Sequence, residues 1–303
     1  MKNEMQSKPF ISIVTINYNQ LNVTLEFLNS LKVSKYKNFE VIVVDNNSAF
    51  NPKETINKLY PEVKVLVNAI NLGFAGGNNS GINIAKGDYI LLINNDTEIS
   101  DTLLELLLVP FYQDERVGVV SPKIVFYHSP DLIQYAGFNP LHPITGRTSA
   151  VGNMEKDLGQ YNYLSETNGA HGCTMMVSRK VIDNVGLMPE LYFLYYEEWD
   201  WSKQINKAGY KIMYQGNAII YHKESISTGK NTPLKTYYHT RNRILFMRRH
   251  SSPKSLFLFY AFFYFITLPK NTLKCLFTGQ LEHVKSLWKG VWWNLKNYKI
   301  INI

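Results

Sequence analysis

The chain has 303 residues, of which 45% are hydrophobic and 18% are charged, and this composition is that of a globular protein and excludes a disordered one. It contains only two cysteines, Cys173 and Cys275, so a disulfide framework is excluded and a reducing compartment is expected. The net charge of +8 is unevenly spread: residues 234–303 carry 12 Lys and Arg against one acid, Glu282. The remainder is slightly acidic, so we expect an anionic partner for the last part of the chain only.

Strands and helices are expected to alternate from residue 10 to about residue 110. Short apolar runs predict strands at residues 10–16, 40–44, 64–67 and 90–93. Helices are expected between them at residues 21–31 and 52–59, and a third follows the glycine-rich run at residues 71–79 and ends near residue 86. This alternation is typical of an α/β fold with a doubly wound, mostly parallel sheet.

Polar side chains follow three of these strands, at Asn17, at Asp45 and at residues 94–96. The carboxyl ends of parallel strands meet at one edge of the sheet, where open α/β sheets bind their ligands. A carboxylate such as Asp96 at that edge can hold a metal ion against a phosphate. The alternative is a polar turn in which Asp96 or Thr97 caps the next helix. For Asp45 the alternatives are a hydrogen bond from a pyrimidine base and an Asx-turn.

The second half of the chain has one segment dense in carboxylates. Residues 125–165 show little periodicity, and we expect an irregular segment there. Residues 192–201 (YFLYYEEWDW) then place three carboxylates, Glu197, Glu198 and Asp200, among six aromatic residues. Apolar surroundings raise the pKa of a carboxyl group toward the range of a general base. The alternative is an acidic first helical turn that is stabilised by the helix dipole.

The basic extension begins at about residue 231. Residues 256–268 are apolar but shorter than the roughly 20 residues of a membrane-spanning helix, and residues 273–291 mix apolar residues with lysines as in an amphipathic helix. Basic residues combined with Trp and Phe suit a helix that lies on an anionic membrane surface. Nucleic acid is not expected as a partner, because no binding module is present. A solvated basic face and a packing or homodimer interface are the alternatives.

Seven motifs, taken in order, resemble those of glycosyltransferase family 2 in its bacterial rhamnosyltransferase-like branch. They are SIVTINYN (12–19), VIVVDNNS (41–48), NLGFAGGNNSGI (71–82), LLINNDTEI (91–99), GAHGCTMMVSR (169–179), FLYYEEWDW (193–201) and Tyr237-Tyr238 with Arg241-Asn242. The resemblance covers roughly residues 9–250. It implies a GT-A fold over residues 8–230, and the composition indicates a helical, basic extension over 231–303. It also implies inverting transfer of a sugar, with rhamnose as a candidate, from a nucleoside-diphosphate sugar to a hydroxyl of a cell-surface glycan or lipid-linked acceptor.

The resemblance also implies roles for individual residues. Glu198 takes the position of the general base, although Glu197 stays open as the alternative. Asp96 and His222 take the positions of ligands to Mg²⁺ or Mn²⁺. His171 and Asp200 are expected on the acceptor side, and a structural histidine is the alternative for His171. The residues expected to bind the donor are Thr15, Asn17, Asn19, Asp45, Asn47, Gly73, Asn78, Asn94, Asn95 and Arg241. The expected location is cytoplasmic and peripheral, on the inner face of the cell membrane.

Two other classes of function are weighed against this one. A sugar-phosphate nucleotidylyltransferase needs a loop rich in glycine and arginine after the first strand, where this chain has residues 17–20 (NYNQ). A catalytically silent nucleotide-sugar-binding or scaffold subunit stays open, because Asn94 stands where the family has the first carboxylate of its Asp-x-Asp motif.

Overall fold

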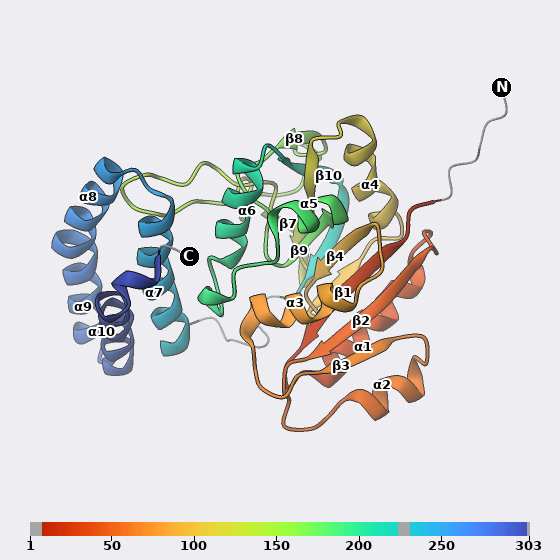
Figure 1. The fold of residues 1–303 in the computed structure, drawn as a ribbon, viewed down its shortest axis with the longest axis horizontal. Helices are drawn as coiled ribbons and strands as arrows, with labels where there is room; N and C mark the ends of the chain where they lie inside the picture. Colours follow the sequence, from red (N-terminus) through yellow and green to blue (C-terminus); the bar gives the residue numbers. More distant parts are fainter. Residues whose placement is uncertain (1–7, 224–230, 302–303) are drawn as a thin grey trace.

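A mixed β-sheet forms the centre of the computed structural model, which describes residues 8–223 and 231–301 (Figure 1). The strand order is β3-β2-β1-β4-β9-β6-β10-β5, with β7 paired to β6 and β8 paired to β10. The strands are β1 (Ile11–Asn17), β2 (Phe39–Asp45), β3 (Lys64–Val67), β4 (Tyr89–Ile93), β5 (Thr97–Ile99), β6 (Val117–Phe126), β7 (Ser129–Tyr135), β8 (Leu164–Glu166), β9 (Thr174–Ser178) and β10 (Lys211–His222).

The first half of the sheet is parallel, as the alternation of strands and helices predicted. β1 pairs in parallel with both β2 and β4, and β2 pairs in parallel with β3. The second half is mixed, because β9 is antiparallel to β4 and to β6, and β5 is antiparallel to β10. One strand differs from prediction, because β7 lies in the segment that was expected to be irregular.

Helices cover both faces of the sheet. They are α1 (Leu21–Ser30), α2 (Lys53–Leu59), α3 (Gly73–Ile84), α4 (Leu103–Gln113), α5 (Arg179–Val185) and α6 (Glu197–Lys207), with short 3₁₀ turns η1 (Leu31–Val33) and η2 (Glu190–Tyr192). Apolar residues of α1, α2 and α4 form one buried cluster with Ile13, and those of α3, α5 and α6 form a second cluster with Val14. Successive β1 side chains point to opposite faces, so this one strand contributes to both cores.

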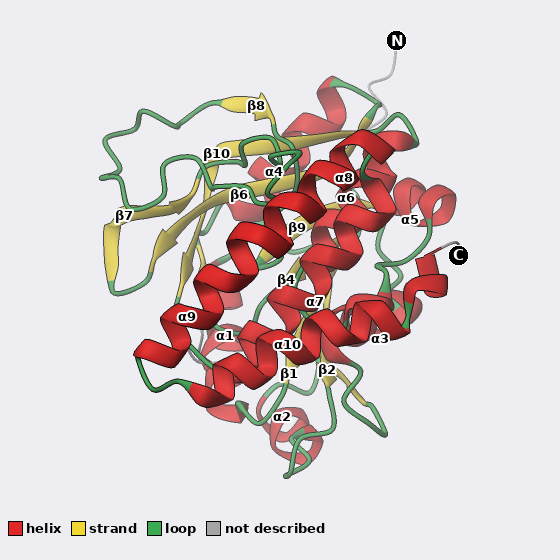
Figure 2. Ribbon diagram, turned by 90° about the vertical axis from the view of Figure 1, so that its left-hand side faces the viewer, coloured by secondary structure: helices red, strands yellow, loops and turns green. Residues whose placement is uncertain are grey.

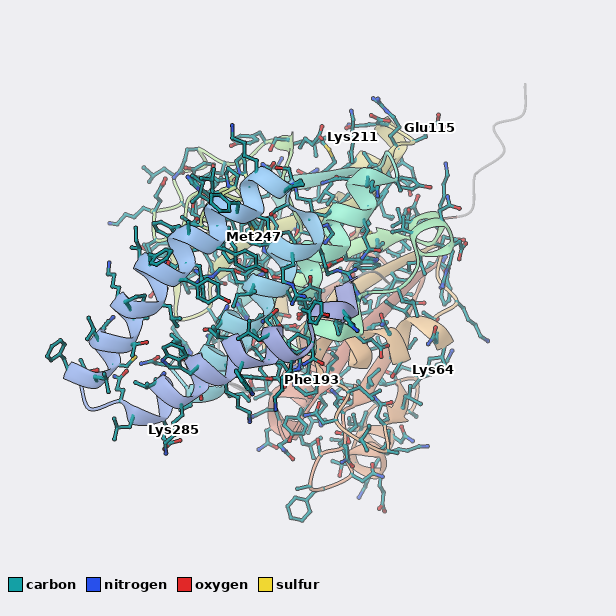
Figure 3. The ribbon with its side chains drawn as sticks, turned by 60° about the vertical axis from the view of Figure 1, so that its left-hand side comes forward. Lys64, Glu115, Phe193, Lys211, Met247 and Lys285 are labelled. Atoms are coloured by element: carbon teal, nitrogen blue, oxygen red, sulfur yellow. The ribbon has the colours of Figure 1, made fainter. Side chains whose placement is uncertain are left out.

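The C-terminal extension adds a layer of helices beside α6 (Figures 1 and 2). It consists of α7 (Pro233–His250), α8 (Pro253–Phe262), the π-helical turn η3 (Phe263–Thr267), α9 (Leu268–Phe277), α10 (Leu281–Lys296) and the 3₁₀ turn η4 (Tyr298–Ile301). A third apolar cluster joins Tyr192 and Trp199 to these helices. Lys285 lies at the outer surface of α10 (Figure 3). The predicted domain boundary at residue 230 lies outside the described residues.

The extension departs from two predictions of helix length. α8, η3 and α9 form one continuous helix of 25 residues, Pro253–Phe277, so the apolar helix is longer than the 256–268 run indicated; its apolar 18-residue window has a mean hydropathy of 1.2. By length and composition alone it is long enough to cross a membrane. Pro269 does not end this helix. In an ordinary α-helix a proline removes one backbone hydrogen bond, and its ring clashes with the carbonyl of the preceding turn. Here the wider π turn η3 lies directly before Pro269 and relieves that clash. The predicted helix over residues 273–291 is instead divided between α9 and α10 at Gly279, whose φ is +69°.

Candidate active site

The three polar clusters at strand ends lie together and are joined by hydrogen bonds. The Asn17 amide, at the end of β1, donates to Asp45 Oδ1 at the end of β2 over 2.7 Å. The Thr24 hydroxyl of α1 donates to Asn17 Oδ1 over 2.8 Å, and the Asn95 amide after β4 donates to Thr24 Oγ1 over 2.9 Å. Because β1, β2 and β4 are parallel neighbours, their carboxyl ends form one polar edge, as expected from the sequence.

Asp45 is enclosed within that edge. Its side chain is buried, and its two oxygens accept hydrogen bonds from the Ser48 backbone N–H at 3.0 Å and the Ser48 hydroxyl at 2.6 Å, as well as from Asn17. These contacts form the Asx-type turn that was the alternative for Asp45. Binding of a base by this carboxylate stays a prediction.

The other donor candidates surround this edge. Thr15 is buried, and its Oγ1 has no hydrogen-bond partner among the described residues. Asn19 and Asn47 are exposed and have φ angles of 55° and 64°, a left-handed conformation that asparagine tolerates better than most residues. Asn78 is buried in α3 and donates to the Phe74 carbonyl. Asn94 is half-buried, and its backbone N–H donates to the Cys173 carbonyl over 2.8 Å.

Asp96 and His222 meet although 126 positions separate them in the chain. β5 follows Asp96 directly and pairs in antiparallel register with the end of β10, where Thr97 faces His222. Asp96 Oδ1 lies 3.3 Å from His222 Nε2, and both side chains are less than a tenth exposed. The turn at residues 95–96 leads into β5 and not into a helix, so the helix-capping alternative for Asp96 and Thr97 is wrong.

The Asp96–His222 pair has the chemistry of a divalent-cation site. Asp96 Oδ1 is buried without a hydrogen-bond partner among the described residues, and His222 Nδ1 donates to Gln134 Oε1 over 2.7 Å, which leaves Nε2 directed at Asp96. A histidine ligand to a metal commonly donates its other ring N–H in this way. Burial lowers the pKa of His222, but Cys173 and Asp96 raise it more, so it stays well above its ordinary value. In the described ranges no third His, Cys, Asp or Glu completes a metal-binding group.

A loop that precedes β9 connects this pair with the rest of the site. Cys173 interacts with His222, and the Cys173 N–H donates to His171 Nδ1 over 3.1 Å. The His171 ring stacks on Phe138, and burial together with the charge of His222 lowers its pKa to about 3, so it is neutral and carries its proton on Nε2. Gly172, between these residues, faces Glu198: a Cβ on Gly172 would lie 3.8 Å from Glu198 Cγ.

The carboxylate segment is held in an unusual backbone conformation. Phe193, Tyr195 and Tyr196, directly before α6, have φ angles of 65°, 68° and 76°, a conformation that costs energy for aromatic residues. The Asn242 amide of α7 donates to the carbonyls of Tyr192, Leu194 and Tyr195 at 3.0, 2.7 and 2.8 Å. A single buried amide from the extension therefore stabilises the strained turn.

Gly73 brings this turn against α3. Gly73 has a φ of +73°, and a Cβ at this position would lie 2.2 Å from the Phe193 carbonyl oxygen, which accepts a hydrogen bond from the Phe74 N–H over 2.7 Å. Only glycine fits there. The glycine-rich loop, expected to shape a nucleotide pocket, thus also fixes the position of the turn that leads into Glu197 and Glu198.

The two glutamates begin α6 in surroundings that disfavour negative charge. Burial raises the pKa of Glu198 to about 7, against the lowering effect of backbone N–H groups at the start of the helix. Burial and the neighbouring charge of Glu198 raise the pKa of Glu197 well above its ordinary value. Glu197 is only 3% exposed, whereas Glu198 is partly exposed. A partly exposed carboxyl with a pKa near 7 is suited to accept a proton at neutral pH.

The sequence of residues 12–186, more than half of the chain, matches the family model described as glycosyl transferase family 2. The chain belongs to glycosyltransferase family 2. It is 25% identical over 267 residues to the N-acetylglucosaminyl-diphospho-decaprenol L-rhamnosyltransferase of Mycobacterium tuberculosis, a match that covers 80% of this chain and 85% of that protein. The nucleotidylyltransferase alternative is therefore wrong.

Solved structures confirm the GT-A fold of this glycosyltransferase. The crystal structure of GalNAc-T7 with UDP, GalNAc and Mn²⁺ aligns with a TM-score of 0.62 at 15% identity, over 75% of this chain and 45% of that one. The mannosyltransferase PcManGT of Pyrobaculum calidifontis, in complex with GDP-Man and Mn²⁺, aligns with a TM-score of 0.58 at 13% identity, over 96% of this chain and 76% of that one.

Two of the residues expected to bind substrate are engaged within the glycosyltransferase itself. Asp200 is fully buried and accepts a hydrogen bond from the Tyr192 hydroxyl at 2.6 Å, and it forms ion pairs with Arg249 at 2.7 Å and His250 at 2.8 Å. Arg241 is 7% exposed, donates to the Leu191 carbonyl, and lies 4.0 Å above the Trp293 ring. The geometry thus connects Asp200 and Arg241 to the packing of α7 against the carboxylate segment, and substrate binding by either stays a prediction.

Sequence reasoning missed several residues that shape the site. The buried Asn46 amide accepts from the Asn68 amide and the Leu72 N–H, and donates to Asn71 Oδ1 and the Gly73 carbonyl, so it anchors the glycine-rich loop to the end of β2. Its position within VDNNS was the available signal. Asn242 was quoted only as part of a motif, and nothing in the sequence connected it with the turn before Glu197.

Proposed function

We propose that this glycosyltransferase inverts the anomeric centre of a sugar as it transfers it from a nucleoside-diphosphate sugar to a hydroxyl of a glycan carried on a lipid diphosphate. The Mycobacterium tuberculosis relative, whose name gives it an acceptor of this class, supports the choice of acceptor, and a deoxyhexose such as rhamnose is the first donor to test. The structural neighbours with UDP or GDP-Man support a nucleotide donor.

One observation carries the proposal: the loop at residues 171–173 lies beside both the Asp96–His222 pair and the candidate base Glu198. Cys173 interacts with His222 and, through its carbonyl, with Asn94, while Gly172 next to it faces Glu198. A donor whose diphosphate lies at Asp96 and an acceptor hydroxyl at Glu198 would thereby both lie next to one short loop. Inversion requires that the acceptor oxygen then attack the anomeric carbon from the side opposite the leaving diphosphate.

Glu198 acts as general base in the proposed reaction. Its carboxylate accepts the proton of the acceptor hydroxyl while the acceptor oxygen forms a bond to the anomeric carbon, and the bond from that carbon to the diphosphate oxygen breaks. The nucleoside diphosphate leaves with the electron pair. Asp96 and His222 would hold a Mg²⁺ or Mn²⁺ ion, which neutralises the negative charge that develops on the leaving diphosphate. The neutral His171, beside the same loop, is a hydrogen-bond donor toward the acceptor through Nε2.

The extension attaches the enzyme to the membrane that carries such an acceptor. Only 22% of the apolar window in the helix Pro253–Phe277 is buried, and Phe265 and Phe277 are 83% and 87% exposed. Trp288 and Trp292 of α10 are 49% and 57% exposed. These apolar side chains, among lysines, suit binding to an anionic surface, and we place the enzyme on the cytoplasmic face of the cell membrane.

A donor screen tests the proposal. We expect a nucleoside-diphosphate sugar to raise the melting temperature in the presence of Mn²⁺, and the increase to be smaller in EDTA. The stabilising donor is then incubated with the enzyme, Mn²⁺ and water or a lipid-linked acceptor, and the released nucleoside diphosphate is measured. Stabilisation with no release from wild-type protein, under conditions where the acceptor is present, would establish the catalytically silent subunit instead.

A further inference from the structure

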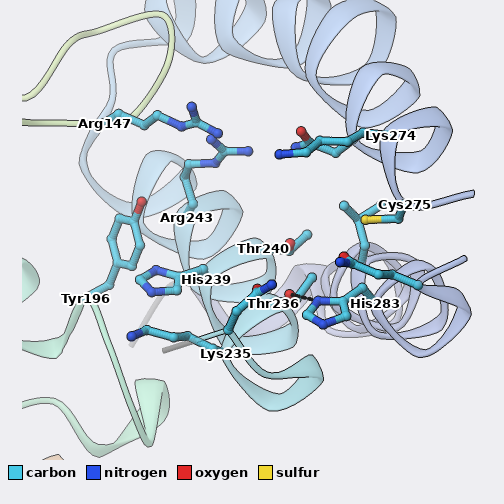
Figure 4. Close-up of a pocket in the computed structure, with 14 residues that line it drawn as sticks. Arg147, Tyr196, Lys235, Thr236, His239, Thr240, Arg243, Lys274, Cys275 and His283 are labelled. Carbon is cyan, nitrogen blue, oxygen red and sulfur yellow. Dashed lines mark hydrogen bonds between the residues drawn. The ribbon is translucent and has the colours of Figure 1, made fainter. Parts of the chain in front are cut away.

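A basic cavity lies within the extension, apart from the strand-end cluster. It is an open cavity with a volume of about 480 Å³, lined by residues of α7, α9, α10 and the loop between β7 and β8 (Figure 4). Four cationic side chains line it: Arg147 of the loop, Lys235 and Arg243 of α7, and Lys274 of α9. Figure 4 shows Lys274 extending from α9 toward the two guanidinium groups.

The positive charge of this cavity is uncompensated by the part of the chain that the structure describes. The described lining residues include no Asp or Glu, and the ion pairs found between described residues involve none of the four cations. Arg243 is only 7% exposed, and its Nε has no hydrogen-bond partner within the described ranges. Burial is the main reason that the pKa of Arg243 falls to about 10, and the like charge of Arg147 lowers it further, against the effect of Tyr196.

Holding these like charges together costs folding energy that an anion would recover. A buried cation is unfavourable unless it is paired, and the Phe263 ring, 5.0 Å from the Arg243 guanidinium, compensates only in part. Desolvation, together with the charges of Lys235, Arg243 and Arg147, also lowers the pKa of His239 to about 4. Guanidinium pairs favour phosphate oxygens, to which they donate two parallel hydrogen bonds. The cavity thus has the chemistry of a phosphate or diphosphate site.

The walls of the cavity connect it both to the candidate base and to the apolar surface. Tyr196, two residues before Glu198, lines the cavity, and its hydroxyl donates to the Gly146 carbonyl over 3.1 Å, next to Arg147. On the other side, α9 directs Lys274 into the cavity while Leu273, Leu276 and Phe277 of the same helix are exposed. A ligand with a phosphate group, an apolar chain and a sugar can therefore reach the cavity, the apolar helix and the base at once.

We propose that this cavity binds the diphosphate of the lipid-linked acceptor, with Arg147, Lys235, Arg243 and Lys274 as its ligands and the prenyl chain along the exposed side of α9. The inference rests on the proposed function, whose donor site lies at the strand ends. It adds that the acceptor is recognised by its diphosphate, and not only by its sugar.

Calorimetry in EDTA with farnesyl diphosphate as the probe tests the inference. Arg147 and Lys274 have exposed side chains, so the double variant R147Q/K274Q removes two charges with little risk to folding. The matched control K254Q/K285Q removes two exposed lysines that do not line the cavity. We expect R147Q/K274Q to bind the probe at least tenfold more weakly than wild type, and K254Q/K285Q to stay within twofold. Equal loss in both double variants, or wild-type affinity in R147Q/K274Q, would overturn the inference.

Two further arms identify the source of the phosphate. We expect farnesyl diphosphate to bind more tightly than inorganic diphosphate, and we expect soluble glycerol phosphate, which carries the phosphate of a lipid headgroup without its acyl chains, not to displace it. Inorganic diphosphate that binds equally well, or glycerol phosphate that displaces the probe at equal phosphate concentration, would overturn the assignment to a lipid-linked acceptor.

The failure of the inference and that of the proposed function are distinguishable. Affinity for the stabilising nucleotide sugar, measured with Mn²⁺, should be unchanged in R147Q/K274Q, while KM for the lipid-linked acceptor rises. If a donor binds but the cavity variant does not affect the probe, only the inference fails. If the cavity variant weakens probe binding but no nucleotide sugar binds the wild type, the proposed function fails and the diphosphate site remains.

Discussion

Replacing Glu198 by glutamine should make the protein more stable above neutral pH while it removes most of the activity. Glutamine keeps the size and hydrogen bonding of the side chain but cannot ionise. In wild type the folded protein holds the Glu198 carboxyl at a pKa of about 7, against an ordinary value of 4.5. A raised pKa means that the folded state disfavours the carboxylate. The penalty is fully present above pH 7, declines as the pH falls from 7 to 4.5, and is absent below that range.

The magnitude follows from the same two values. The difference between a pKa of about 7 and one of 4.5 corresponds to about 3 kcal/mol for a wholly buried group. Since Glu198 is partly exposed, solvent reduces this figure, and we expect E198Q to gain about 1–3 kcal/mol in free energy of unfolding at pH 8. The gain should vanish near pH 4.5. Turnover should fall by about 10²–10⁴-fold with donor affinity close to wild type, as expected for loss of a general base.

Urea unfolding of wild type, E198Q and E197Q at pH 5 and pH 8, with turnover measured in parallel, checks this reasoning. A loss of stability in E198Q at pH 8, or the same difference at both pH values, would refute the electrostatic argument. Loss of turnover in E197Q but not in E198Q would show that Glu197 is the base.

Three further outcomes are expected. D96A should abolish transfer and the metal-dependent part of nucleotide-diphosphate affinity, as measured by calorimetry with and without Mn²⁺; wild-type affinity that ignores a chelator would contradict the metal site. N242A should lower the free energy of unfolding by about 2–3 kcal/mol and reduce turnover, because the Asn242 amide donates hydrogen bonds to three backbone carbonyls of the turn before α6. An unchanged urea midpoint and turnover would show that the turn is stable without these hydrogen bonds. F265S/F277S should reduce flotation with anionic vesicles at unchanged melting temperature, since both side chains are exposed; equal flotation would place membrane binding elsewhere.

Much of the fold follows from local pattern. Short apolar runs bounded by polar residues correspond to β1, β2 and β4. Their length and continuous hydrophobicity predict buried parallel strands without any knowledge of which strands pair. Parallel pairing then brings Asn17, Asp45 and Asn95 to one edge, because the direction of the strands decides where their ends lie. Sequence pattern predicted helix ends less well. A proline usually ends a helix, yet the π turn before Pro269 allows the helix to continue to Phe277.

The sequence by itself determined the family, the parallel half of the sheet and the kinds of side chain available for chemistry. The tertiary structure alone decided which of them meet. Asp96 approaches His222 because β5 and β10 pair in antiparallel register, and the four cations of the basic cavity come from the β7–β8 loop, α7 and α9. Such contacts depend on long-range packing of segments far apart in the chain, whereas sequence patterns report only on neighbours within a turn or a strand. For the same reason the sequence did not reveal the partners of Asp200, which lies buried against Arg249 and His250 of a helix that begins 33 residues further along the chain.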